Sequence, residues 1–174
     1  MTLRFSEDWY DSYKKRVSVP KSSKKSSLIK KTSKKVAALI SPHAQALARL
    51  AKNPAIAKGK GEHFYQVRYF DYFERHHPDL YQLLHATPNG GYRTDKVGAE
   101  MKAEGQKKGY PDISLDAASQ GYHGLRIEMK FGSNTLTAEQ KTWRERLEGQ
   151  GYKYAECRST EDAISVTLDY MNSK

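Results

Sequence analysis

The stretch that decides the fold is GYPDISLDAASQGYHGLRIEMK, residues 109–130. Its last six residues alternate apolar and charged side chains: Leu125, Arg126, Ile127, Glu128, Met129 and Lys130. This is the period-2 pattern of a strand with one apolar and one charged face. A shorter apolar alternation, Ile113 and Leu115, follows Pro111-Asp112. The polar, glycine-containing connection between the two runs is short, so the stretch predicts an antiparallel hairpin.

The predicted hairpin would bring Asp112 close to Glu128, with Lys130 one step further along the same face as Glu128. Two carboxylates at the polar edge of a sheet would bind a divalent cation through oxygen ligands. Lys130 would then orient or deprotonate a water for attack on phosphorus. The same residues also allow a purely structural interpretation. Pro-Asp is a common turn dipeptide, and Glu-x-Lys on a strand is often a solvated face.

Composition limits the class of protein. The 174 residues, 37% of them hydrophobic, suffice for one domain with some spare sequence. No apolar run approaches the roughly 18–20 residues of a membrane span, and no N-terminal signal pattern occurs. The single cysteine, Cys157, excludes an internal disulfide framework, and its apolar-alternating surroundings predict a buried thiol. These features predict a reducing, cytoplasmic setting and no membrane partner.

Positive charge is concentrated in the N-terminal third. The net charge is +10, yet residues 1–61 hold 15 Lys and Arg against 3 Asp and Glu. Residues 62–174 hold 15 Lys and Arg against 17 Asp and Glu, so the remainder of the chain is nearly neutral. A basic arm on a near-neutral body points to a polyanionic partner, most often nucleic acid.

Residues 1–60 are therefore predicted to form a basic arm. A short helix is expected within residues 1–16, and residues 36–52 predict a helix interrupted at Ser41-Pro42. Residues 20–35 are nearly all lysine and serine, which predicts a flexible tether. The tether either contacts phosphates or is a solubilising linker. The lysines expected to contact DNA are Lys24, Lys25, Lys30, Lys31, Lys34 and Lys35.

Residues 61–174 predict an α/β domain with a small mixed β-sheet flanked by helices. The expected helices are residues 62–75, 94–106, 137–149 and 159–171. The expected strands are residues 80–87, 113–115, 125–130 and 152–157. Helix N-caps are expected at Thr94, Thr137 and Ser159. In the helix that follows Thr94, the side chains of Val97 and Met101 are expected to face inward.

The helix expected from residue 62 carries polar and aromatic side chains on one face. The positions that recur with helical spacing are Glu62, Gln66, Tyr69, Phe70 and Phe73. A carboxylate on a face that enters the core is costly unless it is paired or bound to metal, which makes Glu62 a candidate ligand. The alternative is that Glu62 lies at the surface and interacts favourably with the helix dipole.

Gln140 and the turn at Pro88-Asn89-Gly90-Gly91 also have two interpretations each. Gln140 shares a helix face with Trp143 and Leu147, so it should point toward the domain. It also completes a Thr-x-x-Gln capping box, which is a structural role. The turn would bring backbone N–H groups close to a phosphate, or it would simply reverse the chain.

Five short segments in order carry a resemblance to a known family. They are Glu62-x-x-x-Gln66, Pro88-Asn89-Gly90-Gly91, Gly109-x-Pro111-Asp112, Ile127-Glu128-Met129-Lys130, and Gln140 before Gly151-Tyr152. Together they resemble the virus-type replication-repair nuclease domain, VRR-NUC, over residues 62–171. This is a branch of the PD-(D/E)XK nucleases, which have a restriction-endonuclease-like fold. The chain most resembles short, stand-alone members from bacteriophages and prophages, although Tyr110 is bulkier than the small apolar residue expected there.

The resemblance implies Mg²⁺- or Mn²⁺-dependent cleavage of DNA phosphodiesters. The metal ligands it implies are Glu62, Asp112, Glu128 and the backbone carbonyl of Met129. It implies that Lys130 positions the attacking water and steadies the developing charge. It also implies that Gln66 and Gln140 support the site or touch the nucleic acid. The expected DNA contacts outside the arm are Asn89, Gly90 and Arg93.

Small members of this family resemble Holliday-junction resolvases, which implies a homodimer acting on branched DNA in phage replication or repair. Two active sites related by a two-fold axis would suit such a substrate. The alternative hypothesis is a DNA-binding or scaffold protein that has a nuclease-like fold but does not cut. In that case the basic arm would be the functional part.

Overall fold

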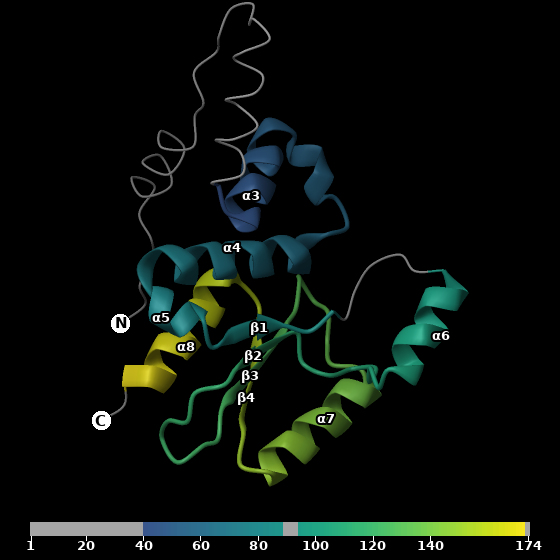
Figure 1. Cartoon of the computed structure of the whole chain (residues 1–174), viewed down its shortest axis with the longest axis vertical. Coiled ribbons are helices and arrows are strands. Elements are labelled where there is room, and N and C mark those ends of the chain that lie inside the picture. The colour runs from purple at the N-terminus through teal and green to yellow at the C-terminus, as the bar shows by residue number, and fades with distance from the viewer. Residues whose placement is uncertain (1–39, 89–93, 173–174) are drawn as a thin grey trace, which may run out of the picture. The chain divides into compact units, whose positions relative to one another are not determined.

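The computed structural model describes residues 40–88 and 94–172 (Figure 1). The chain divides into two compact units, Met1–Pro54 and Ala55–Lys174. The helix expected within residues 1–16 and the lysine-rich tether lie outside the described residues, as do Asn89, Gly90 and Arg93. No helix in the described part of the chain is both long enough and apolar enough to cross a membrane.

The described part of the first unit is helix α3, Pro42–Lys52. Ser41 caps it, because its hydroxyl accepts a hydrogen bond from the backbone N–H of Ala44 over 3.2 Å. The predicted break at Ser41-Pro42 coincides with the start of α3, and residues 36–39 of the expected helix lie outside the described residues. A proline is well tolerated in the first helical turn, where its missing N–H would have no intrahelical partner.

The second unit is a mixed α/β domain, which confirms the predicted fold class. Its helices are α4 (Gly61–His76), α5 (Pro78–Tyr81), α6 (Asp95–Ala103), α7 (Ala138–Gly149) and α8 (Thr160–Asn172). A short 3₁₀ helix, η1 (Pro54–Ala57), precedes them. Its strands are β1 (Leu84–Ala86), β2 (Ile113–Leu115), β3 (Leu125–Met129) and β4 (Lys153–Cys157). The strands lie in the order β1-β2-β3-β4; β1–β2 and β2–β3 pair antiparallel, and β3–β4 pair parallel.

The apolar face of the sheet forms the core with α4 and α8. From β3, the side chains of Leu125, Ile127 and Met129 are at most 1% exposed. Figure 1 shows α4 and α8 on one side of the sheet and α7 on the other. A buried hydrogen bond of 2.8 Å joins the Tyr69 hydroxyl on α4 to the Thr167 hydroxyl on α8, so the two helices are tied together within this core.

The opposite face of β3 is polar but not solvated. Arg126 and Glu128 are 6% and 1% exposed, so the interpretation of this face as solvated is wrong. Arg126 forms an ion pair of 3.1 Å with Asp116, and its guanidinium lies 4.3 Å from the ring centre of Tyr152. A buried charge is stable only with partners of this kind.

Two further local predictions need correction. The strand expected over residues 80–87 is limited to β1, because Pro78 starts the helical turn α5 and Leu80 lies within it. Val97 does not face inward: its side chain is 42% exposed, and α6 contains no buried residue. Figure 1 shows α6 standing away from the sheet, and Met101, the other residue expected to face inward, is half-buried.

The predicted caps are confirmed. Thr94 accepts from the backbone N–H of Val97, and Ser159 accepts from that of Asp162 over 3.0 Å. Thr137 and Gln140 form the expected capping box at the start of α7. Cys157 is fully buried, as predicted, and burial raises the pKa of its thiol to about 12, with the nearby charges of Asp162 and Glu156 adding to the shift.

Candidate active site

The β2–β3 hairpin places Asp112 beside the end of β3. Ile113 pairs with Ile127, so Asp112, which precedes β2, continues the polar face that carries Glu128. One Asp112 carboxylate oxygen, Oδ2, accepts a hydrogen bond of 3.0 Å from the backbone N–H of Met129. The backbone carbonyl of Asp112 accepts another, of 2.8 Å, from the backbone N–H of Thr87. The residue is thus held by backbone groups on both sides of β2.

The segment before Asp112 is anchored on helix α7. Gly109 has φ +78°, and a Cβ added there would lie 2.8 Å from the Cβ of Glu139 and 3.0 Å from the backbone nitrogen of Gln140. The indole N–H of Trp143 donates to the carbonyl of Lys108 over 3.1 Å. A glycine is required at position 109 for both conformation and space, because the segment and the helix start lie in close contact.

Glu128, Lys130 and Gln140 form a hydrogen-bonded cluster. The Nζ of Lys130 donates to the Oε1 of Glu128 over 3.0 Å and to the Oε1 of Gln140 over 2.9 Å. The side-chain N–H of Gln140 donates to the same oxygen of Glu128. The Oε1 of Gln140 also accepts from the backbone N–H of Thr137 over 2.9 Å. The structure therefore supports both interpretations of Gln140, since one amide caps α7 and contacts the cluster.

Burial and like charges destabilise the ionised form of Glu128. Its side chain is 1% exposed, and burial, together with the charge of Asp112, raises the pKa of its carboxyl from 4.5 to about 8. The charge of Glu62 contributes in the same direction, and Lys130 opposes the shift. Within the described residues the second carboxylate oxygen, Oε2, has no hydrogen-bond partner. A buried acceptor without a partner is an available ligand for a cation or a water.

Glu62 reaches the site from the first turn of α4. Its Oε1 accepts hydrogen bonds of 3.2 Å from the backbone N–H of Phe131 and from the amide of Asn134. Gly61 lies directly beneath the Phe131 ring, where a Cβ would collide with ring atoms. Glu62 is therefore not simply a surface residue facing the helix dipole, since two groups from the loop after β3 hold it.

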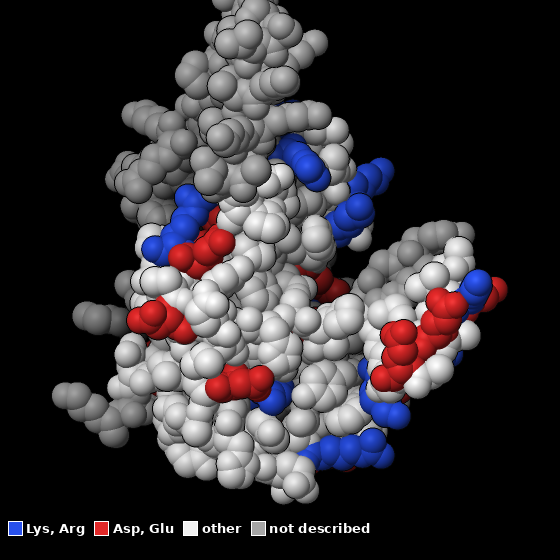
Figure 2. Space-filling view, in the orientation of Figure 1, with Lys and Arg blue, Asp and Glu red and all other residues white. Residues whose placement is uncertain are grey.

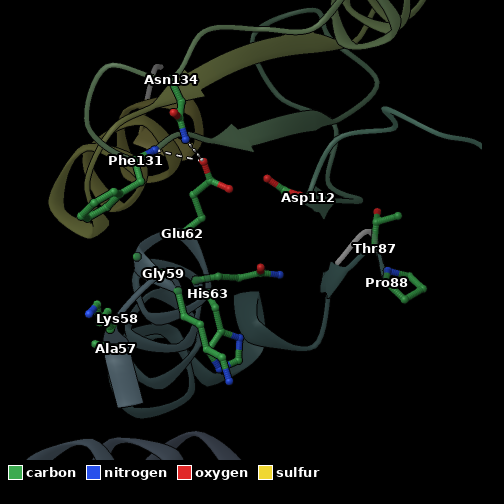
Figure 3. A pocket seen from close by; sticks show the side chains of 13 residues that line it. Ala57, Lys58, Gly59, Glu62, His63, Thr87, Pro88, Asp112, Phe131 and Asn134 are labelled. Atoms are coloured by element: carbon green, nitrogen blue, oxygen red, sulfur yellow. Dashed lines mark hydrogen bonds between the residues drawn. The ribbon is translucent and has the colours of Figure 1, made fainter. Parts of the chain in front are cut away.

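A pocket of about 920 Å³ collects part of the predicted site. The site residues among its lining are Glu62, Gln66 and Asp112. Figure 3 shows the carboxylates of Glu62 and Asp112 turned toward the same space, and Figure 2 shows acidic side chains in the hollow between the start of α4 and α6. The lining described does not include Glu128, Lys130 or Gln140, which belong to the buried cluster.

The predicted residues thus form two neighbouring groups rather than one assembled metal centre. Among residues 40–88 and 94–172, no three His, Cys, Asp or Glu side chains are grouped so that they could hold a metal ion. The groups are linked through Asp112, which lines the pocket and bonds to the backbone of Met129. The loop residues that hold Glu62 were not predicted, and Asn134 lies 72 positions away with no sequence pattern to reveal it.

Comparison with known proteins places these features in a family. The model of the VRR-NUC domain matches residues 51–161. The chain belongs to the VRR-NUC family. A solved structure described as "VRR_NUC domain protein" is 32% identical, with a TM-score of 0.55; the match covers 63% of this chain and 87% of that one. A search of curated proteins found no match. The family is one of nucleases, so the predicted resemblance is confirmed and nucleic acid is the implied substrate.

Proposed function

We propose that this VRR-NUC chain is a Mg²⁺- or Mn²⁺-dependent endonuclease that hydrolyses DNA phosphodiesters. The observation that carries the proposal is the buried Glu128–Lys130–Gln140 cluster beside Asp112. A domain evolved only for stability would gain little from a buried carboxylate whose pKa is raised to about 8 and whose Oε2 lacks a partner in the described part of the chain. Such a group is useful when its environment changes on binding a ligand.

The donor set fits a hard divalent cation. Asp112, Glu128 and Glu62 would supply carboxylate oxygens, joined by the backbone carbonyl of Met129, and such ions prefer oxygen ligands. The Oε2 of Glu128 is the ligand atom that supports this fit most directly, because it is buried and has no hydrogen-bond partner among the described residues. When bound, the metal would stabilise the charge that develops during in-line displacement at phosphorus. Glu62 would join these ligands from the first turn of α4, where Phe131 and Asn134 hold one of its carboxylate oxygens.

Lys130 is suited to hold the attacking water. A lysine ammonium has three N–H donors, and Lys130 uses two of them on Glu128 and Gln140. The third would remain for a water or for a phosphate oxygen that gains charge during the reaction. Gln140 keeps the ammonium in position, and Gln66, which lines the pocket, would contact the nucleic acid or support Glu62.

The remaining predictions belong to this proposal. Residues 61–174 would form the nuclease domain, and the basic arm of residues 1–60 would add phosphate contacts. The DNA contacts proposed within the arm and the turn are Lys24, Lys25, Lys30, Lys31, Lys34, Lys35, Asn89, Gly90 and Arg93. A homodimer acting on branched DNA during phage replication or repair would suit this arrangement.

A non-cleaving DNA-binding or scaffold role is the second candidate. It is favoured by the finding that, in the described part of the chain, no three potential ligand side chains are grouped as a metal site. The two candidates differ in their response to Mn²⁺. A nuclease site should show saturable thermal stabilisation by Mn²⁺ that is lost in Asp112→Asn and Glu128→Gln, whereas a scaffold should show none.

Cleavage of labelled DNA is the direct test. The full chain should cut single-stranded, duplex, flapped or four-way DNA in Mg²⁺ or Mn²⁺, and Lys130→Ala should bind the same DNA without cutting it. Lys141→Ala is a suitable control, because Lys141 is an exposed lysine of α7 outside the cluster. Undiminished cutting by Lys130→Ala would refute the assignment of Lys130.

A further inference from the structure

One wall of the pocket carries charge opposite to that of Glu62 and Asp112. Lys58 and Lys60 lie on the segment between η1 and α4, and Phe131, whose ring covers Gly61, lines the same pocket; we call these three residues the basic wall. Figure 3 shows Lys58 and Phe131 on the Glu62 side of the pocket, while Thr87 and Pro88 lie near Asp112. Carboxylates and cations therefore share one space, as a phosphodiester bound to a metal-dependent site requires.

Lys58 and Lys60 take part in the turn before α4 through their backbones, and their side chains face solvent. Both are exposed, and neither forms an ion pair within residues 40–88 and 94–172. Gly59 between them has φ +70°, and a Cβ there would have no atom within 4 Å. Backbone hydrogen bonds from Lys58 to Ala55 and from Lys60 to Ala57 hold the segment, while the exposed ammonium groups remain available for phosphate oxygens.

Phe131 is an exposed aromatic ring that lines the pocket. It is 48% exposed, although most rings of this size are buried in the core. One side of the ring covers Gly61, and the ring centre lies 5.5 Å from that of Tyr65. This packing fixes the ring while leaving nearly half of the residue exposed. A fixed, exposed ring beside cations is the combination that binds unpaired nucleotides, by stacking on the base and pairing with the backbone phosphate.

We propose that the basic wall binds one unpaired nucleotide next to the scissile phosphate. Lys58 and Lys60 contact its flanking phosphates, and Phe131 stacks on its base. The inference depends on the proposed nuclease function and defines the substrate class further. A base within an intact duplex is stacked on its neighbours and is not available to Phe131, so the wall favours single-stranded, flapped or branched DNA. The pocket of about 920 Å³ lies within the usual range for ligand pockets, about 300–1,000 Å³.

Equilibrium binding in EDTA tests the wall separately from catalysis. The probes are a single-stranded oligonucleotide, a flapped duplex and an uninterrupted duplex of the same sequence. For the full chain, Phe131→Ala should weaken binding of the first two by about 5- to 150-fold, the usual contribution of one stacked base, and leave duplex binding nearly unchanged. Phe131→Leu, which still covers Gly61, should lose the same preference, so loss of the ring is separated from loss of packing. Tyr122→Ala removes another exposed aromatic and is the control.

The salt dependence of binding tests the lysines. The double variant Lys58→Ala/Lys60→Ala should reduce the slope of log K against log salt by about 1.4 on single strands, since each phosphate contact contributes about 0.7. Lys102→Ala/Lys141→Ala, which removes two exposed lysines outside the pocket, should leave the slope nearer that of the parent chain. Equal reductions in the two double variants would overturn the role of Lys58 and Lys60.

The outcomes separate this inference from the proposed function. If the parent chain cuts DNA but Phe131→Leu keeps the same preference for unpaired DNA, the basic wall is refuted and the nuclease stands. Suppose instead that the parent chain cuts no DNA but binds unpaired DNA more tightly than duplex, and that Phe131→Leu lacks this preference. The wall is then a binding site for unpaired DNA, and the nuclease proposal fails. Photocrosslinking from an iodouracil placed in the flap should map to Phe131, and a crosslink that maps elsewhere counts against the wall.

Discussion

The Nζ of Lys130 lies 2.9 Å from the Oε1 of Gln140, so the N-terminal cap of α7 and the buried cluster share one side chain. Gln140 completes the capping box with Thr137 and at the same time donates to Glu128. The start of α7 therefore fixes the geometry of the proposed catalytic lysine. This coupling explains how a residue with a structural role also contributes to the site.

Gln140→Ala should lower the cleavage rate by about 10- to 100-fold, the usual reduction when an outer partner of a metal ligand is removed. It should also lower the stability, because it removes the N3 half of the capping box. Thr137→Ala is the matched control, because it removes the other half of the capping box and leaves the Gln140 contacts with Glu128 and Lys130. Single-turnover cleavage and denaturant unfolding measure the two effects. Equal rate reductions in both variants would show that the cap, rather than the amide, matters.

Gly109→Ala should disturb the site through Asp112. The substitution is strained at φ +78°, and its Cβ would meet α7 at 2.8 Å. Gly105→Ala is the matched control, because Gly105 also has a positive φ, +98°, yet nothing lies within 4 Å of a Cβ there. Both variants should lose stability in denaturant unfolding, about 1–2 kcal/mol from the backbone alone. Gly109→Ala should lose more stability than Gly105→Ala, and it alone should lose the thermal stabilisation by Mn²⁺.

Local patterns predicted the parts of the fold that local forces determine. The β2–β3 hairpin, the caps at Thr94 and Ser159 and the capping box at Thr137 depend on neighbouring residues, and all are present. The extent of β1 was not predicted correctly, because the apolar residue Leu80 fits either a strand or the helical turn that Pro78 begins.

Contacts between segments that are distant in the chain could not be predicted from local sequence patterns. The pattern of β3 indicates a charged face but not whether water or α7 covers it, and in the structure Arg126 and Glu128 are buried. Likewise, the hydrogen bond from Asn134 to Glu62 has no local signature. The site residues remain a prediction of the resemblance. The structure shows that three of the predicted residues, Glu128, Lys130 and Gln140, are hydrogen-bonded to one another.

The metal-free stability of the chain should depend on pH through Glu128. Its pKa is raised from 4.5 to about 8, so the folded state binds this proton more tightly than the unfolded state. The resulting stabilisation is fully present below pH 4.5 and is lost as pH rises toward 8, at up to about 1.4 kcal/mol per pH unit. In EDTA, urea unfolding across this range should show a steeper decline for the parent chain than for Glu128→Gln. Parallel curves would place the pKa of Glu128 near its ordinary value.

Removing residues 1–39, the part of the arm that holds the lysine-rich tether, should test the tether separately from the pocket, because this deletion leaves η1, Lys58 and Lys60 in place. If the arm contacts phosphates, DNA affinity should fall and the salt slope should flatten by about 0.9 for each duplex phosphate that the arm had neutralised. Cleavage at saturating DNA should remain, because the Glu128–Lys130–Gln140 cluster lies entirely within the second unit. A version with the tether lysines replaced by serine keeps the length of the arm and tests charge alone. If this version matches the full chain in affinity and salt slope, the arm is a linker and the nuclease domain binds DNA without it.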